Sequence, residues 1–155
     1  MRRDPTTNAA TKLTGTVRAI LDGKDSAIRS IGPTETVYAA VAMLKEYRVG
    51  ALLVMQDSQL LGMFSERDYA RKVVLLGKMS RETLVSEIMT PRVVSVEPNW
   101  TADQCMALMT EKRIRHLPVM EQGRLVGVIS IGDVVRAVVD EQQFTIDALQ
   151  RYITS

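Results

Sequence analysis

The segments Gly62-Met63-Phe64-Ser65-Glu66-Arg67-Asp68 and Gly127-Val128-Ile129-Ser130-Ile131-Gly132-Asp133 decide the fold, because they are two copies of one motif. In each copy an apolar run leads to a serine, and an aspartate follows three residues later. This pattern predicts a strand that runs into a helix, where unpaired backbone N–H groups favour an anion. A serine hydroxyl there can help to hold a phosphate, and an ionised aspartate can accept both hydroxyls of a ribose.

The motif is part of a longer duplication. A shift of 65 positions pairs residues 33–71 with residues 98–136, and 13 of the 39 pairs are identical. Upstream, residues 17–21 match residues 85–89 at a shift of 68, so the first copy carries three additional residues around position 24. Self-similarity at a fixed period indicates a repeated structural unit.

Each copy has the pattern β-α-β-β-α. A short extended segment (27–31 or 92–96) precedes a helix for which Thr34 or Asn99 is the expected cap. Two strands follow (50–55 and 60–64, or 116–120 and 125–129), and the motif serine opens a second helix. A unit of about 55–60 residues buries too little surface to be comfortably stable alone. We therefore expect an α/β (α+β) fold in which the two repeats pack sheet to sheet with pseudo-twofold symmetry.

These repeats predict a simple division of the chain. The expected parts are an N-terminal arm at 1–14, a first repeat at 15–76, a linker at 77–84, a second repeat at 85–138 and an amphipathic tail at 139–155. In the tail, Ile146, Leu149 and Ile153 fall on one helical face, which could dock on a partner or on a second copy.

Composition excludes several classes of protein. Twenty basic and 18 acidic residues give a net charge of +2, too balanced for a nucleic-acid-coating surface. The single cysteine, Cys105, cannot form an internal disulfide and is expected to be an inert core thiol. Together with the lack of an apolar leader, this favours a cytoplasmic location. No apolar run approaches the roughly 18–20 residues that span a bilayer, so no membrane association is expected.

The motif has a purely structural interpretation as well. Ser-x-x-Asp is an ordinary helix-capping pattern, and a single copy would favour that interpretation. Its recurrence at the same place in a repeat favours a ligand site instead. Capping does not require the preceding Gly62 and Gly127, where the backbone could pass close to a ligand.

Taken together, the motifs resemble those of a pair of cystathionine-β-synthase (CBS) domains. The resemblance covers about residues 15–138 and rests on the repeated Gly-x-x-Ser-x-x-Asp, on Ile-Met-Thr-Pro at 88–91 and on Arg-Ile-Arg-His-Leu-Pro-Val at 113–119. It implies a module with up to two clefts for adenosine-containing ligands and a disc-like homodimer. AMP is the expected regulatory ligand, with ADP, ATP and NAD as alternatives.

The resemblance also implies which residues form each cleft. Ser65 and Asp68 belong to the first, and Ser130 and Asp133 to the second. Adenine is expected on the backbone around Ala27, Ile28, Val93 and Val94, and phosphate near Gly50 and Ala51 or near Arg115 and His116.

The two clefts are not expected to be equivalent. Arg67 lies inside the first motif, so the first cleft is expected to hold a phosphorylated ligand more tightly. The second cleft is the alternative, because the backbone at Gly132 allows a close approach. Lys24, which belongs to the three additional residues, could reach a nucleotide in that first cleft, although a plain surface position is the simpler expectation.

Three functions compete. The first is a non-catalytic sensor of adenine nucleotides. The second is a ligand-independent dimerisation or interaction module that regulates a partner enzyme or transporter. An enzyme is the weakest, because no nucleophile accompanies the single histidine, His116, in sequence. Metal-ligand spacings and glycine-rich phosphate loops are also missing from the sequence, so we expect no catalytic residue, no metal and no catalytic cofactor.

Overall fold

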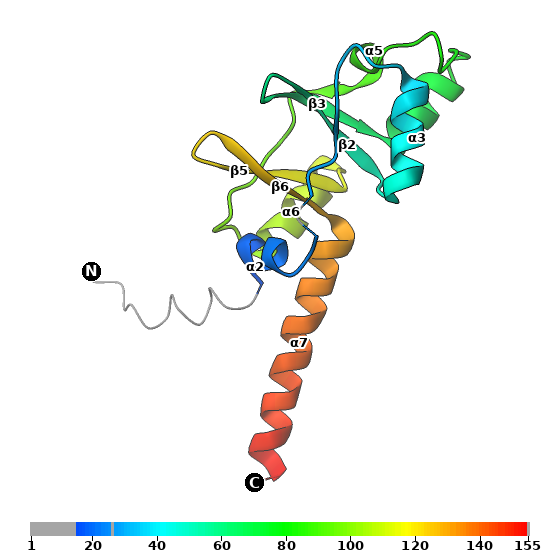
Figure 1. The fold of residues 1–155 in the computed structure, drawn as a ribbon. Coiled ribbons are helices and arrows are strands. Elements are labelled where there is room, and N and C mark those ends of the chain that lie inside the picture. Colours follow the sequence, from blue (N-terminus) through cyan, green and yellow to red (C-terminus); the bar gives the residue numbers. More distant parts are fainter. Residues whose placement is uncertain (1–14, 26, 155) are drawn as a thin grey trace. The chain divides into compact units, whose positions relative to one another are not determined.

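A computed structural model describes residues 15–25 and 27–154 and divides them into two compact units (Figure 1). Unit 2 is the continuous stretch Ala27–Val94. Unit 1 combines the described residues before it with those from Ser95 onward. Both units mix helices and strands, as the duplication predicts.

Unit 2 is built on a four-stranded sheet in the order β1-β2-β3-β4. Strand β1 pairs in parallel with β2, while β2–β3 and β3–β4 are antiparallel. The β2–β3 turn has positive φ at Asp57 and Ser58, the geometry that suits tight hairpins. Its elements are β1 (Ser30–Ile31), α3 (Val37–Tyr47), β2 (Ala51–Gln56), β3 (Gln59–Ser65), α4 (Glu66–Asp68), the π-helix η1 (Tyr69–Val74), α5 (Val85–Ile88) and β4 (Thr90–Pro91).

The core of unit 2 lies between this sheet and its helices. Alternate residues of the strands turn inward, so that Leu52, Val54 and Phe64 are almost completely buried. Val37 from α3 and Val85 from α5 complete the same cluster. Aliphatic burial therefore holds this unit together, with one aromatic ring at its centre.

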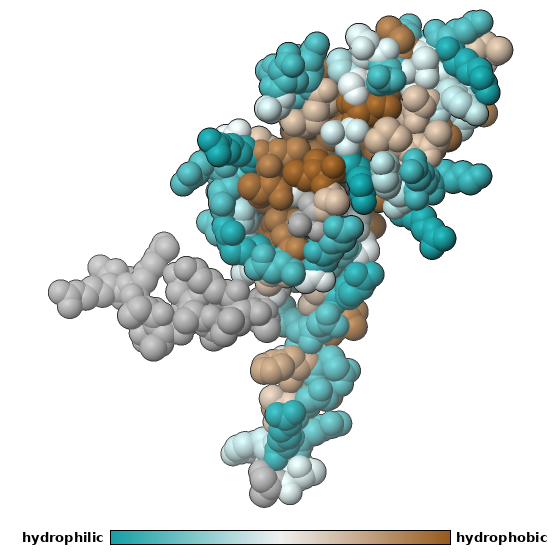
Figure 2. All heavy atoms as spheres, in the orientation of Figure 1, coloured by the Kyte–Doolittle hydropathy of each residue, from teal (hydrophilic) through white to brown (hydrophobic). Residues whose placement is uncertain are grey.

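Unit 1 is built on the antiparallel hairpin β5–β6, which has the same register as β2–β3. Val96 adds a parallel bridge to Val119, where unit 2 has strand β1. Figure 2 shows apolar side chains gathered over β5 and β6. The elements are α2 (Val17–Asp22), α6 (Ala102–Lys112), β5 (His116–Glu121), β6 (Arg124–Ser130) and α7 (Ile131–Thr154).

The two short helices α2 and α5 are exchanged between the repeats. Helix α2 begins the first repeat in sequence, yet the Val17 N–H donates to the Trp100 carbonyl at 2.9 Å, within unit 1. Helix α5 begins the second repeat, yet the Val85 N–H donates to the Glu35 carbonyl at 2.9 Å, within unit 2. Each unit therefore takes its short helix from the start of the repeat that forms the rest of the other unit.

The helix starts correct one prediction. The N-caps of α3 and α6 are Thr36 and Thr101, not Thr34 and Asn99. Each threonine has extended backbone, and its hydroxyl accepts the N–H three residues ahead, at 3.1 Å in both helices. Each turn contains two polar residues that could cap the helix. The second of them, Thr36 or Thr101, has the extended backbone of an N-cap.

Helix α7 joins two segments that the sequence analysis separated. The helix that the second motif opens continues without interruption through the predicted tail, from Ile131 to Thr154. Val134 is buried within unit 1, whereas every residue from Val139 to Thr154 is exposed. The outer part of α7 thus presents its whole circumference to its surroundings.

Candidate functional site

Both motifs close a strand and open a helix with the same pair of hydrogen bonds. In unit 2 the Asp68 N–H donates to Ser65 Oγ at 3.2 Å, and the Ser65 N–H donates to Asp68 Oδ2 at 3.0 Å. In unit 1 the Asp133 N–H donates to Ser130 Oγ at 3.2 Å, and the Ser130 N–H donates to Asp133 Oδ2 at 2.9 Å. The capping interpretation is therefore correct for both copies. A ligand can use only those acceptor sites of each aspartate that the capping hydrogen bonds do not occupy.

Both carboxylate oxygens of Asp68 already have partners in unit 2. Oδ2 also accepts the Ser65 hydroxyl at 3.1 Å. Oδ1 accepts the Thr90 hydroxyl at 3.1 Å and lies 3.0 Å from the Lys72 ammonium. With only 8% of the residue exposed, the carboxylate is buried and its charge is already balanced by its own unit.

Asp133 is satisfied on one side only. Oδ2 takes the Ser130 N–H and the Lys24 ammonium, the latter at 2.7 Å. Oδ1 faces the exposed Arg136 guanidinium at 4.0 Å, beyond hydrogen-bond distance. Of the hydrogen bonds within residues 15–25 and 27–154, none ends at this oxygen. One carboxylate oxygen of the second motif is therefore free to accept a ligand hydroxyl.

The charge on Asp133 is stabilised by its neighbours. Burial alone would raise the pKa of this carboxyl, but hydrogen bonds from Lys24 and Ser130 and the positive charge of Lys24 outweigh it, so the net pKa is lowered. The group is accordingly an ionised acceptor at neutral pH.

His116 and Arg115 lie next to this carboxylate. In the β5–β6 register His116 is paired with Ser130, and the Arg115 carbonyl accepts the Ile131 N–H at 2.8 Å. Burial, followed by the charges of Lys24 and Arg115, lowers the pKa of His116, although Asp133 opposes the change. The imidazole is therefore neutral at neutral pH, in a region that also contains two cations.

A groove of about 340 Å³ opens beside Asp133 between α2 and α7. Ala19 and Ile20 line it from α2, and Ala137 and Phe144 line it from α7. The lining also includes the carboxylates of Asp140 and Glu141, which disfavour an anion at that end.

Lys24 does not serve the first motif as expected. Its ammonium donates to Asp133 and to the Val128 carbonyl, the latter at 3.0 Å, so it belongs to the second motif. The exchange of α2 explains the error, because the residues that follow this helix accompany it into unit 1. Sequence proximity to the first repeat was misleading.

Gly62 and Gly127 also have a different role from the one expected. A Cβ atom on Gly62 would lie 2.7 Å from the Thr90 carbonyl oxygen, and one on Gly127 would lie 2.6 Å from a methyl of Leu21. Both contacts come from the exchanged segments, since Leu21 lies in the last turn of α2 and Thr90 follows α5. These glycines make room for the exchanged segments rather than for a ligand.

The other predicted residues lie in unit 2 and stay predictions. Arg67 is exposed on the first helical turn after Ser65. Around it the structure places the exposed Ala27 and Ile28 and the half-buried Gly50, Ala51, Val93 and Val94. Two partners of Asp68 were missed: Thr90, within the 88–91 motif, and Lys72, whose spacing of four residues from Asp68 was a usable signal.

Two classes of site find no support among the described residues. No group of three or more His, Cys, Asp or Glu side chains there is placed to hold a metal ion. Nor does any helix in residues 15–25 or 27–154 combine the length and apolarity that a bilayer crossing demands.

Comparison with known families agrees with the duplication. The profile of the CBS domain matches residues 17–75 and again residues 85–140. The two matched segments correspond to the two repeats and together cover most of the chain.

Individual relatives give the same result. The CBS domain-containing protein CBSX3, mitochondrial, of Arabidopsis thaliana is 42% identical over 77% of this chain, which spans about 60% of that relative's length. A solved protein with CBS domains from Burkholderia ambifaria, provisionally assigned to signal transduction, is 49% identical with a TM-score of 0.80, covering 84% of this chain and 98% of that one. A cytoplasmic location for the present chain stays a prediction.

One solved relative is an assembly. The hexameric CBS-CP12 protein from bloom-forming cyanobacteria is 28% identical, with a TM-score of 0.69 over 77% of this chain and 70% of that chain.

Proposed function

The chain belongs to the CBS domain family, and we propose that it is a non-catalytic sensor that binds an adenine nucleotide at its second motif. AMP is the first candidate, and ADP, ATP and NAD present the same adenosine and phosphate groups. The Asp133 carboxylate carries the proposal: its Oδ1 has only Arg136 nearby, at 4.0 Å, while its Oδ2 binds the Lys24 ammonium.

Ribose recognition follows from the state of the Asp133 carboxylate. An ionised carboxylate only accepts hydrogen bonds, and a ribose diol offers two donors at adjacent carbons. Oδ1 can take one hydroxyl at once, and Oδ2 can take the other when Lys24 turns away. A hydrogen bond to a charged group contributes roughly 1.5–3 kcal/mol, which is enough to make this contact decisive for affinity.

Phosphate recognition follows from the surrounding charges. Lys24 is free to contact a phosphate once it leaves Asp133, and Arg115 is an exposed cation close enough to His116 to lower its pKa. The Ser130 hydroxyl and the first-turn backbone at Gly132 add donors at the start of α7. A nucleotide thus exchanges one ion pair for another, whereas adenosine would break the Lys24–Asp133 pair without compensation.

This exchange gives a signalling mechanism. Lys24 follows α2, and its bond to Asp133 ties that helix end to α7. A nucleotide that replaces Lys24 as the partner of Asp133 breaks this link between α2 and α7. It shifts the equilibrium between the linked and unlinked states only by its different affinity for the two.

The test is isothermal titration of AMP, ADP, ATP, NAD and adenosine into the wild type, Asp133→Asn and Asp140→Asn. Asp133→Asn should weaken AMP binding by about 10–100-fold. Asp140→Asn removes a carboxylate from the same groove but not from the motif, and should leave the affinity within about twofold. Absence of binding by every nucleotide at millimolar concentration would contradict the proposal.

The alternative is a ligand-independent interaction module that regulates a partner enzyme or transporter. The saturated carboxylate of Asp68 supports it, because that motif is fully used by its own unit. Affinity capture of partners with and without AMP separates the two functions. Capture that never responds to AMP, combined with silent titrations, would favour the module.

A further inference from the structure

One face of α7 carries a seam with the spacing of a coiled coil. Its positions alternate by four and three residues along the helix, which is the heptad pattern. We call this set the α7 seam: Val135, Val139, Gln142, Ile146, Leu149 and Ile153.

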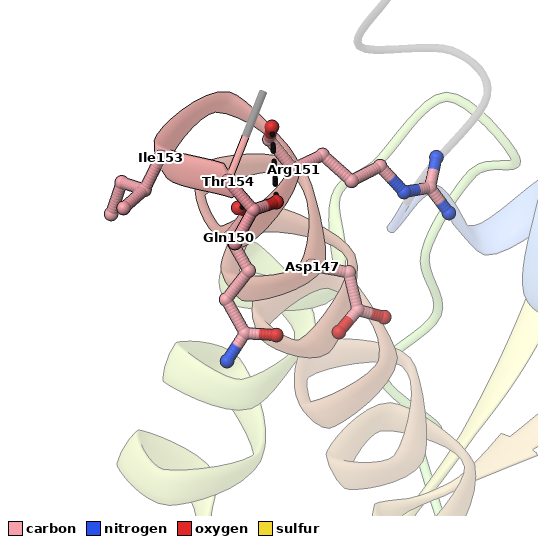
Figure 3. A pocket seen from close by; sticks show the side chains of 5 residues that line it. All are labelled: Asp147, Gln150, Arg151, Ile153 and Thr154. Atoms are coloured by element: carbon pink, nitrogen blue, oxygen red, sulfur yellow. Dashed lines mark hydrogen bonds between the residues drawn. The ribbon is translucent and has the colours of Figure 1, made fainter.

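The seam is exposed along its whole length. Val135 is 43% exposed, Ile146 48% and Ile153 79%, and the remaining members are exposed as well. Figure 3 shows Ile153 projecting to one side of the helix end, while Asp147 and Arg151 extend on the other. The shallow hollow at this end is lined by a single helix, so it is part of the surface of α7 rather than a ligand pocket.

The residue types in the seam specify a partner. In heptad terms Val139, Ile146 and Ile153 occupy the a positions, and Val135, Gln142 and Leu149 occupy the d positions. β-Branched residues at every a position, with leucine at one d position, match the pattern of two parallel strands. Gln142 is the single polar member here, and a parallel copy would place it beside its own counterpart.

The flanking positions allow such a pair. One flank is Arg136, Gln143 and Gln150, and the other is Val138, Thr145 and Tyr152. Arg136 carries the only charge among these six, so two parallel copies would meet almost no like-charge repulsion. The charged residues Asp140, Asp147 and Arg151 lie around the opposite side of the helix.

We propose that two copies of this chain associate through the α7 seam as a parallel two-stranded coiled coil. The interface consists of knobs from α7 of each copy, with Gln142 beside its counterpart. It is separate from the nucleotide site, because Asp133 lies on the opposite side of α7 from the seam and the groove beside it is bounded by α2.

The first test is the mass in solution by light scattering and sedimentation, over a range of protein concentrations. The wild type should have the mass of two chains. Leu149→Glu places two charges in the seam and should raise the dissociation constant by roughly 100-fold or more. Ala148→Glu, the matched control on the neighbouring position outside the seam, should remain dimeric. A monomeric wild type, or a Leu149→Glu variant that stays dimeric, would overturn the proposal.

The second test remains informative even if a charged seam disturbs the helix. Leu149→Cys should form a disulfide-linked dimer under mild oxidation, because equivalent d positions face each other only in a parallel pair. The native Cys105 is a suitable background, since it is buried and burial raises its pKa to about 11. Cross-linking that appears only when Val139→Cys is mixed with Leu149→Cys would overturn the parallel arrangement.

Discussion

The two copies of the Ser-x-x-Asp motif share their capping hydrogen bonds and differ in everything that surrounds the aspartate. Asp68 is surrounded by four donor groups from its own unit, and both of its oxygens are used. Asp133 has one oxygen paired with Ser130 and Lys24 and one that is open. The same four-residue pattern has thus become a structural element in one copy and a candidate binding element in the other.

The difference originates in the exchanged segments. Thr90 arrives beside Asp68 as a short neutral donor, whereas Lys24 arrives beside Asp133 as a long, mobile cation. A hydroxyl held in a strand cannot be displaced without disturbing β4, but a lysine can change partner by rotation of its side chain. Four sets of substitutions test this contrast.

The largest effect is expected at the buried carboxylate. Asp68→Asn leaves Lys72 without its counter-charge and replaces one of the two acceptor oxygens that serve Ser65 and Thr90 with a donor, and should lower the free energy of unfolding by about 3 kcal/mol. Asp133→Asn should cost about 1 kcal/mol because its surroundings are more open. Urea unfolding measures both. Equal losses would mean that the two motifs are not structurally different.

A smaller effect is expected at the two glycines. Gly62→Ala directs a methyl group against the Thr90 carbonyl, which is backbone and cannot move freely, and should destabilise by about 2 kcal/mol. Gly127→Ala meets the end of the Leu21 side chain, which can rotate, and should cost about 1 kcal/mol or less. Thermal unfolding of each variant gives the order, and a reversed order would contradict the assigned contacts.

The next effect concerns ligand preference. Lys24→Met should weaken AMP binding by about 10-fold through loss of a charged phosphate contact, while adenosine binding stays unchanged or improves. Lys72→Met, the equivalent loss of a partner at Asp68, should leave both affinities unchanged. Titration of both ligands into both variants decides the matter. A parallel loss of AMP and adenosine would make Lys24 purely structural.

The smallest effect is a pH dependence. His116 has a pKa lowered from its ordinary value of 6.5, so the unfolded chain binds a proton more readily than the folded one. The resulting stability is present above that value and is lost as the pH falls from 6.5 through the folded pKa. In His116→Gln this part of the acid sensitivity should disappear. The free energy of unfolding is measured for both proteins between pH 7.5 and 5.5. An equal change of this free energy with pH in both proteins would contradict the prediction.

Much of this architecture could be predicted from the sequence, because duplication and alternating patterns are local signals. The β2–β3 and β5–β6 hairpins and the helix starts at Ser65 and Ser130 follow directly from them. The exchange of α2 and α5 could not be predicted, since nothing in the sequence around Leu21 or Met89 shows which glycine it packs against. The role of Lys24 was missed for the same reason.

The difference between Asp68 and Asp133 could not be predicted either, because it depends on contacts between residues that are distant in sequence. A free oxygen on Asp133 depends on the distance to Arg136, and a saturated Asp68 depends on Thr90, more than 20 residues away. The sequence favoured the first motif because Arg67 lies within it, whereas our proposal uses the second because of its hydrogen bonds, which no sequence pattern reveals.

The exchange of α2 has a consequence for how the chain emerges from the ribosome. Helix α2 is made early, but Leu21 meets Gly127 only after strand β6 has been synthesised. At about 5–20 residues per second, this leaves α2 waiting for roughly 5–20 s. During that time unit 2 can fold first, because residues 27–94 contain all of its helices and strands. The folded unit 2 then links α2 to the part of unit 1 that begins at Ser95, which shortens the flexible chain between them.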